Sequence, residues 1–355
     1  MTVESVIRPE IRGLSAYHVA DAKGLVKLDA MENPWPLPEV VALEMAQACA
    51  HASVNRYPDP RAIGLANRLR QVMAIPDAAG LLLGNGSDEL IQMIAMACAQ
   101  PGTLILGMEP SFVMYRMIAV FCRMRYVGVP LNDDFSINGD RVLDIIHAEQ
   151  PALVFIAYPN NPTGNLFETR VIRDVIAASP GLVVVDEAYH AFAGESAINW
   201  IEEFENLLVM RTVSKLGLAG LRLGYLVGRT AIINEIDKVR LPYNINALTQ
   251  AAGQVALAHH AVFEAQAKEI CAMREAMLEE LVAMEELEVY PSRANFILIR
   301  LARASEVFDG LKKKGILVKN LDKAHPLLEG CLRVTIGTQN ENSMFINHLK
   351  DLVHL

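Results

Sequence analysis

The sequence lacks the features of a membrane-bound, secreted or disulfide-stabilised protein. It contains no apolar run of the ~18 residues that a membrane-spanning helix needs. Arg8, Pro9 and Glu10 interrupt the first residues, where a signal peptide would be apolar. The five cysteines are odd in number and include no C-x-x-C pair, which favours reduced thiols. We therefore expect a soluble cytoplasmic protein with no membrane partner.

Positive charge is also scarce. The chain has 32 Lys and Arg against 41 Asp and Glu, a formal net charge of −9, so we expect no nucleic-acid partner. The nine histidines include no H-E-x-x-H motif. His259 and His260 are adjacent, and neighbouring residues on a helix do not share a face, so we expect no metal. An anionic ligand would have to be held by local cations or by helix N-termini.

The composition does support a large buried core. The chain has 355 residues, of which 52% are hydrophobic, and short apolar runs alternate with helical patterns. This alternation predicts an α/β fold with a mostly parallel central sheet covered by helices. The expected strands are 80–83, 104–106, 125–129, 153–157, 182–185, 207–210 and 223–227, and the clearest helices are 40–50, 88–99 and 167–178.

A change in composition divides the chain. Residues 246–284 are rich in Ala, Glu, Met and Gln, which predicts one or two long helices. A strand at 295–300, a helix at 304–314, short strands near 316 and at 332–336, and a C-terminal helix are expected to follow. We predict an N-terminal arm (1–39) that contributes to the small domain and the active site, a large domain (40–250) and a smaller α+β domain (251–355).

A glycine-rich turn, Gly84 to Glu89, follows one expected strand and opens a helix. Its bare backbone N–H groups and the helix dipole suit an anion, although for this segment alone an ordinary turn capped by Ser87 or Asp88 is the favoured interpretation. Glu89 stands where a dinucleotide-binding fingerprint needs a small residue, and no Gly-Lys-Ser/Thr of a P-loop follows. Any phosphate bound here should therefore be small.

Two further segments place polar groups directly after strands. Residues 158–164 hold two Asn and two Pro, which form either a rigid turn or a source of amide ligands. Asp186 ends a buried strand, where a carboxylate is costly without a partner. It either caps a neighbouring loop or serves as the counter-ion of a buried cationic ring.

Lys215 is surrounded in sequence by small and apolar residues. A surface lysine is the simpler interpretation, but burial would disfavour the ammonium form and leave a nucleophilic amine. Thr212, Ser214 and Arg222 could supply hydroxyls and a cation to a phosphate. Together with the preceding segments, these residues provide each part that pyridoxal 5′-phosphate chemistry requires.

The chain resembles the histidinol-phosphate aminotransferases, a family of fold-type-I pyridoxal-phosphate transferases. The resemblance runs nearly end to end through MENP (31–34), RYPD (56–59), GNGSDELI (84–91), NNPTG (160–164), DEAY (186–189), RTVSKLGLAGLRLGY (211–225) and LRVTIGT (332–338). It implies amino-group transfer between L-histidinol phosphate and 2-oxoglutarate, in L-histidine biosynthesis. Aromatic aminotransferases and threonine-phosphate decarboxylase-like enzymes of the same fold remain alternatives. A regulatory module that borrowed the fold is disfavoured, because Lys215 is retained and no basic helix-turn-helix segment is present.

The resemblance also implies roles for the cofactor-binding residues. Lys215 would form a Schiff base with the cofactor and shuttle the substrate proton, and Asp186 would pair with the ring nitrogen. Asn161 and Tyr189 would hydrogen-bond the phenolic oxygen of the ring, and Phe112 would stack on it. The residues that match the phosphate region are Ser87, Asp88, Thr212, Ser214 and Arg222. The catalytic set is thus Lys215, Asp186 and Tyr189.

Other matching positions concern the substrate and a second subunit. Arg333 matches the arginine that binds the anionic end of the substrate, and Tyr57 matches a tyrosine that reaches the partner subunit's cofactor in a homodimer. Further pocket positions are Tyr17, Asn33 and Tyr243, although Tyr17 and Tyr243 could equally pack at an interface. The chain departs from the family in three places: Lys319 replaces a substrate-binding arginine, Met31 replaces an asparagine, and the stretch 215–222 is one residue shorter than in many members.

Overall fold

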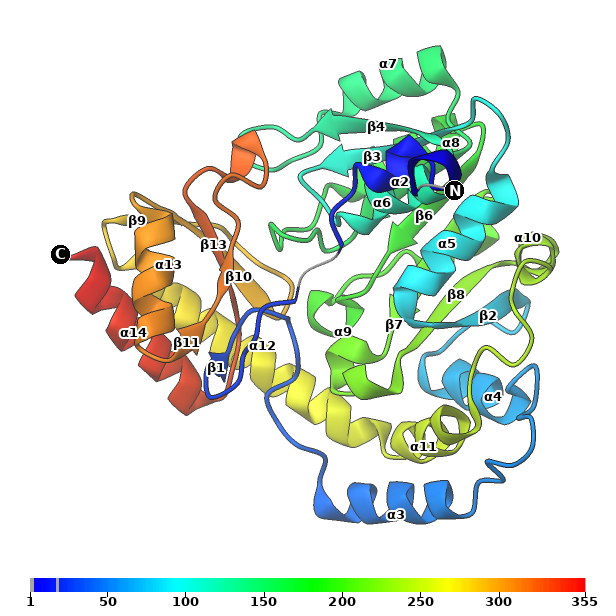
Figure 1. Ribbon diagram of the computed structural model, residues 1–355, viewed down its shortest axis with the longest axis horizontal. Coiled ribbons are helices and arrows are strands. Elements are labelled where there is room, and N and C mark those ends of the chain that lie inside the picture. The colour runs from blue at the N-terminus through cyan, green and yellow to red at the C-terminus, as the bar shows by residue number, and fades with distance from the viewer. Residues whose placement is uncertain (1–2, 17–18, 355) are drawn as a thin grey trace.

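A seven-stranded sheet organises the larger part of the molecule (Figure 1). The computed structural model describes residues 3–16 and 19–354. In chain order the strands are β2 (Ala79–Asn85), β3 (Leu104–Glu109), β4 (Arg125–Pro130), β5 (Leu153–Ala157), β6 (Leu182–Asp186), β7 (Leu207–Thr212) and β8 (Leu223–Arg229), in the spatial order β2-β8-β7-β6-β5-β3-β4. Only β8 runs against its neighbours, β2 and β7. The expected mostly parallel α/β fold is therefore confirmed.

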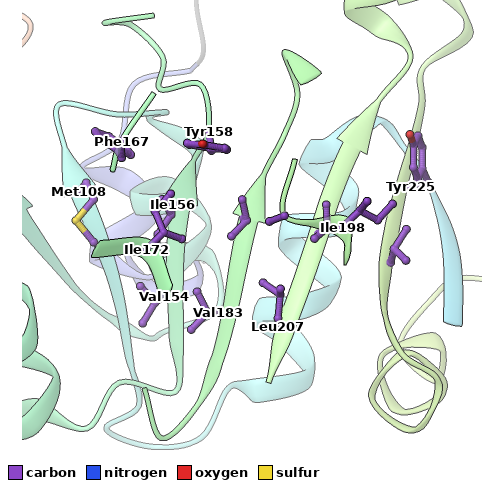
Figure 2. Close-up of a cluster of buried hydrophobic side chains, with 14 of the residues drawn as sticks. Met108, Val154, Ile156, Tyr158, Phe167, Ile172, Val183, Ile198, Leu207 and Tyr225 are labelled. Atoms are coloured by element: carbon purple, nitrogen blue, oxygen red, sulfur yellow. The ribbon is translucent and has the colours of Figure 1, made fainter. Parts of the chain in front are cut away.

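Helices cover both faces of this sheet, so the central strands β5 and β6 are apolar up to their last residues. The helices of this part of the chain are α3 (Glu39–Ala50), α4 (Ile63–Val72), α5 (Gly86–Cys98), α6 (Met114–Phe121), α7 (Gly139–Glu149), α8 (Thr169–Ala178), α9 (His190–Ala193), α10 (Thr230–Asp237) and α11 (Ala247–Ala258). Alternate strand residues enter opposite cores. Val154, Ile156 and Val183 belong to one cluster, part of which Figure 2 shows, whereas Phe155 and Val184 belong to the cluster that packs on α5 and α6.

A second, antiparallel sheet lies beside the first in the order β12-β13-β10-β9 (Figure 1). Its strands are β9 (Leu287–Val289), β10 (Phe296–Leu301), β12 (Lys319–Asn320) and β13 (Cys331–Thr335). The accompanying helices are α12 (His260–Val282), α13 (Ala304–Lys313) and α14 (Gln339–Val353). These elements share a separate hydrophobic core.

The N-terminal segment is attached to both parts of the molecule. It contains two short helices, α1 (Val3–Val6) and α2 (Pro9–Arg12), and α2 lies next to α6 (Figure 1). Further along, β1 (Val26–Lys27) pairs in parallel with β11 (Ile316–Leu317). The backbone N–H of Thr335 in β13 donates to Leu28 O at 2.9 Å. The segment before α3 is therefore fixed to the smaller sheet.

Several elements differ from the sequence expectations. Helix α8 begins at Thr169 rather than at 167, because Glu168 has the non-helical backbone of an N-cap residue, and Phe167 before it packs into the core. The region 246–284 forms two helices, α11 and α12, which meet at His259. The short strands β1, β9 and β12 were not expected, since two or three residues give no periodic pattern. The division at residues 39 and 250 stays a prediction. Within the described residues, no helix combines the length and apolar character needed to cross a membrane.

A buried ion pair joins the carboxyl ends of β6 and β7. Arg211 Nε donates to Glu187 Oε2 at 2.8 Å, and the two side chains are 6% and 0% exposed. Ser196 extends the network by donating from its Oγ to Glu187 Oε2 at 2.9 Å, while its Oγ accepts from Arg211 at 2.6 Å. Neither charge could remain buried without the other.

We expect Arg211→Met to lower the free energy of unfolding by ~3–5 kcal/mol, because Glu187 would stay buried without its cation. Urea denaturation followed by circular dichroism measures this loss. The control is Arg125→Met, which removes a 3.0 Å pair with Glu149 whose partners are 56% and 39% exposed. That change should cost less than ~1 kcal/mol. Equal losses in the two variants would show that burial does not govern the contribution of these pairs.

Candidate active site

One cavity lies at the carboxyl ends of β5, β6 and β7, beside the start of α5. Side chains that the sequence analysis assigned to a cofactor site line it together: Ser87, Asp88, Phe112, Asn161, Asp186, Tyr189, Thr212, Ser214, Lys215 and Arg222. They come from six separate stretches of the chain. The carboxyl edge of a parallel sheet is where open α/β folds bind ligands.

The α5 end of the cavity can hold a small oxyanion. Gly86 opens the helix with φ +76°, and the side chain of Arg222 approaches so closely that a Cβ at Gly86 would lie 2.7 Å from it. Thr212 Oγ1 donates to Ser214 Oγ at 2.8 Å, so two hydroxyls lie together here. Helix N–H groups, hydroxyls and a guanidinium are the usual donors to phosphate oxygens.

Asp88 lies at the α5 end of the cavity as well. It adds a negative charge beside the oxyanion cradle, which consists of the N–H groups at the start of α5, the hydroxyls of Thr212 and Ser214, and Arg222. Its carboxylate is 3.6 Å from Arg222, and both side chains are about half exposed (46% and 53%). Burial raises the pKa of Asp88, and the cations Arg222 and Lys215 oppose that rise. Asp88 therefore suits an oxyanion through the helix N-terminus rather than through its side chain.

Asp186 places a buried carboxylate in the same cavity. It is the last residue of β6 and is 4% exposed. Its Oδ2 accepts a hydrogen bond from the Tyr115 hydroxyl at 2.7 Å, and its Oδ1 accepts one from the Ala188 N–H at 3.1 Å. Burial raises the pKa of Asp186 to about 6, and both hydrogen bonds oppose this rise. Its two donors are neutral, so the carboxylate can still pair with a cation.

Lys215 lies in a single turn of 3-10 helix, residues 214–216, directly after β7. Its Nζ donates to Ala30 O at 3.2 Å and lies 5.8 Å from the centre of the Tyr189 ring. Burial, followed by the nearby charge of Arg333, lowers the pKa of Lys215 to about 8. A lysine in this state offers a larger share of neutral amine near neutral pH than a surface lysine does.

A second cavity adjoins the first and shares Met31, Phe112 and Asn161 with it. Lys319 and Arg333 also line it, from directly paired positions on β12 and β13. Arg333 is 6% exposed and donates to Asn161 Oδ1 at 2.5 Å and to Asp29 O at 2.8 Å. These two cations make the second cavity suitable for the anionic part of a ligand.

Three of the predicted site residues that the structure describes have other surroundings. Asn33 lines neither cavity; its amide donates to Leu216 O at 3.1 Å and to Gln266 at 2.9 Å, which ties the N-terminal segment to the turn that carries Lys215. Tyr57 and Tyr243 stack on each other with their ring centres 4.4 Å apart, and they are 80% and 39% exposed. Tyr17 lies outside the described residues.

Sequence reasoning missed Tyr115, a buried residue that lines the first cavity. It lies on α6, whose apolar pattern conceals it among core residues. Its spacing of three residues from Phe112, which is one helical turn, is the signal that could have identified it.

Comparison with known proteins agrees with this geometry. Residues 23–349 match the family model of aminotransferase class I and II. A histidinol-phosphate aminotransferase of Chromobacterium violaceum is 51% identical over 99% of this chain and 98% of its own length. The histidinol-phosphate aminotransferase 2 of Nitrosococcus oceani is 51% identical over 97% of this chain and 96% of its own length.

Solved structures share the fold. The histidinol-phosphate aminotransferase of Sinorhizobium meliloti, solved with pyridoxal-5′-phosphate, gives a TM-score of 0.87 at 24% identity and covers 99% of this chain and 98% of its own. That of Clostridium acetobutylicum gives 0.85 at 23% identity, covering 93% of this chain and 99% of its own. The expected fold-type-I architecture is thus confirmed. The chain belongs to the class I and II aminotransferases and, within them, to the histidinol-phosphate aminotransferase family.

Proposed function

We propose that this protein is a pyridoxal-phosphate-dependent histidinol-phosphate aminotransferase of L-histidine biosynthesis. It transfers an amino group between L-histidinol phosphate and 2-oxoglutarate, giving imidazole acetol phosphate and glutamate. The observation that carries the proposal is the meeting of Lys215, Asp186 and an oxyanion cradle in one cavity. The 51% identity to histidinol-phosphate aminotransferases over nearly the whole chain favours this substrate over those of the alternative enzymes.

The cavity suits pyridoxal phosphate in three respects. The glycines at 86 and 224 leave the cradle open, since a Cβ at Gly224 would meet the Gly86 backbone at 2.7 Å. Asp186 is a buried carboxylate with neutral donors, which leaves its charge for a protonated ring nitrogen. Lys215 lines the same cavity and offers an amine of lowered pKa. When bound, the cofactor supplies an electron-withdrawing ring that makes the Cα–H bond of an amino acid acidic.

The remaining residues would orient the ring and move the proton. Asn161 and Tyr189 would form hydrogen bonds with the phenolic oxygen of the cofactor ring. Phe112 would stack on one face of that ring. Lys215 Nζ would take the proton from the substrate Cα and pass it to the C4′ carbon of the cofactor, first as a general base and then as a general acid. The phosphate group would bind Ser87, Asp88, Thr212, Ser214 and Arg222, with Asp88 acting through its backbone.

We expect the purified protein to show the visible absorbance that pyridoxal phosphate acquires on covalent attachment to lysine. Lys215→Ala should abolish that band and reduce turnover at least ~10²-fold, because both the attachment point and the proton carrier are lost. Absorption spectroscopy and steady-state assays measure the two effects. Lys238→Ala is the control, since Lys238 pairs with Glu235 on the surface. A normal band in Lys215→Ala would remove the central role of this residue.

Arg333 and Lys319 would bind the anionic end of both substrates in turn. The guanidinium of Arg333 can grip a carboxylate or a phosphate through two parallel hydrogen bonds. Lys319 adds a point charge at the paired position on β12. Lys319 is exposed, whereas Arg333 is buried. The same pair would thus hold the phosphate of histidinol phosphate and a carboxylate of glutamate.

We expect histidinol phosphate to bleach the visible band far more efficiently than phenylalanine or tyrosine does. Arg333→Ala should raise KM for both histidinol phosphate and glutamate, by about 10–100-fold, because hydrogen bonds between charged groups are lost. Stopped-flow half-reactions with each amino donor measure these effects separately. A change for one donor only would argue against a shared anion site. Equal efficiency of the aromatic amino acids would favour the aromatic aminotransferase alternative.

The homodimer that the resemblance implies is supported by an exposed apolar surface. Helix α11 packs against both α3 and α4 (Figure 1). These helices and the loops next to them carry large apolar side chains with at least 39% exposure: Val40, Leu43, Val54, Tyr57, Ile63, Leu241, Tyr243 and Leu248. Exposed apolar side chains that gather in this way are typical of protein–protein interfaces. Tyr57 lines neither cavity of its own chain, which fits a role in the site of the partner subunit.

We expect the protein to sediment as a dimer, and Tyr57→Ala to weaken cofactor binding in the partner's site. Co-expression of Tyr57→Ala chains with Lys215→Ala chains tests whether Tyr57 of one subunit contributes to the site of the other. If Tyr57 acts across the interface, about half of the randomly formed dimers are mixed and each holds one native site, so about a quarter of wild-type activity returns. No recovery in mixed dimers, verified by two affinity tags, would place Tyr57 outside the partner's site.

We also propose a cytoplasmic location. All five cysteines are free thiols, and such thiols persist in reducing compartments. A biosynthetic aminotransferase acting on small phosphorylated metabolites fits the same compartment.

A further inference from the structure

The Asp186 carboxylate has a tyrosine as its closest side-chain partner. Tyr115 Oη donates to Asp186 Oδ2 at 2.7 Å, and both residues line the first cavity. The Ala188 N–H donates to the other oxygen at 3.1 Å. The carboxylate is thus held at both oxygens before any ligand is present, with one donor from a side chain and one from the backbone.

The ring of Tyr115 is fixed independently of its hydroxyl. It is fully buried and stacks on Phe155 of β5, with ring centres 4.6 Å apart and planes 12° from parallel. Phe112 meets it edge-on at 5.6 Å. Because the ring is clamped between two aromatic side chains, the hydroxyl points at Asp186 in a fixed direction. Removing the oxygen alone should leave this packing in place.

Charge considerations explain why Asp186 needs such a donor. Its burial disfavours the ionised form, and the hydrogen bond from Tyr115 counteracts burial. Burial also raises the pKa of Tyr115 well above its usual range, so the tyrosine remains a donor at any working pH. The other charged groups near the carboxyl are Asp88 of α5 and Glu187, which both raise its pKa, and the cations Lys215 and Arg222, which line the same cavity.

We propose that Tyr115 is a positioning residue whose hydroxyl keeps the Asp186 carboxylate ionised and aimed at the ring nitrogen of the cofactor. The inference rests on the proposed function, since it concerns the same cavity and the same cofactor. It adds a residue from α6, 71 positions away in sequence, to the group that sets the protonation of the ring. Tyr115 would act only through Asp186, without touching the substrate.

The test compares Tyr115→Phe with the wild type in cofactor-free protein titrated with pyridoxal phosphate. We expect the dissociation constant to rise about 10-fold, as for the loss of a hydrogen bond to a charged group. Without the hydroxyl, the pKa of Asp186 rises, so the carboxylate is neutralised at a higher pH. Binding should therefore fail at a higher pH in Tyr115→Phe than in the wild type as the solution is acidified.

Two controls separate positioning from packing. Tyr158→Phe removes a matched hydroxyl, since Tyr158 is 1% exposed and donates to Glu195 at 2.7 Å outside both cavities. It should leave cofactor affinity unchanged. A cofactor analogue with carbon in place of the ring nitrogen should bind wild type and Tyr115→Phe equally, because the partner of Asp186 is then missing.

A double-mutant cycle shows whether Tyr115 affects cofactor affinity through Asp186 or through packing. In an Asp186→Asn background, Tyr115→Phe should cause no further loss of affinity. An equal loss in that background, or in binding of the analogue, would show that Tyr115 acts through packing and would overturn the inference. So would an unchanged dissociation constant and pH dependence in Tyr115→Phe. If the wild type itself binds no pyridoxal phosphate, the proposed function fails, and so does the part of the inference that concerns the cofactor ring. Infrared spectra of the cofactor-free protein still report the effect of Tyr115 on Asp186 ionisation.

Discussion

The structure depends on how buried charges are accommodated at the carboxyl edge of β6 and β7. Asp186 and Glu187 are consecutive, and the alternation of a strand sends their side chains to opposite faces of the sheet. Glu187 meets Arg211 on one face and closes a structural ion pair. Asp186 enters the cavity on the other face, where its donors are neutral and its charge remains available. One acidic residue therefore closes an ion pair at the sheet edge while its neighbour lines the cavity.

Much of this arrangement could be predicted from local sequence. The buried central strands are runs of apolar residues, and the polar segments at 84–89, 158–164, 186–189 and 211–215 do line the cavity. The partners of these polar groups could not be predicted. Arg211 lies 24 positions from Glu187, and Tyr115 lies 71 positions from Asp186, so strand order and helix orientation determine both contacts. Asn33 shows the same limit: the motif identified the residue but not its partner Gln266.

Close backbone approach shapes the oxyanion cradle as much as the charges do. Gly224 on β8 faces Gly86 at the start of α5, where a Cβ at Gly224 would meet the Gly86 backbone, and Gly86 itself has a positive φ that favours glycine. The antiparallel strand β8 therefore reaches the helix N-terminus directly, and Arg222, just before β8, lies over it. A sequence shows the glycines, but only the register of β2 against β8 shows that they meet.

The attachment of the N-terminal segment has a mechanical consequence. Ala30 O accepts the hydrogen bond of Lys215, while the adjoining Met31 is held by Thr335 of β13 at 3.0 Å and by Asn295 at 3.0 Å. The amine follows β7 of the larger sheet, whereas its acceptor belongs to the segment that pairs with the smaller part of the chain. A change in the relative orientation of the two sheets would alter the separation of this donor from its acceptor, and with it the surroundings of the amine.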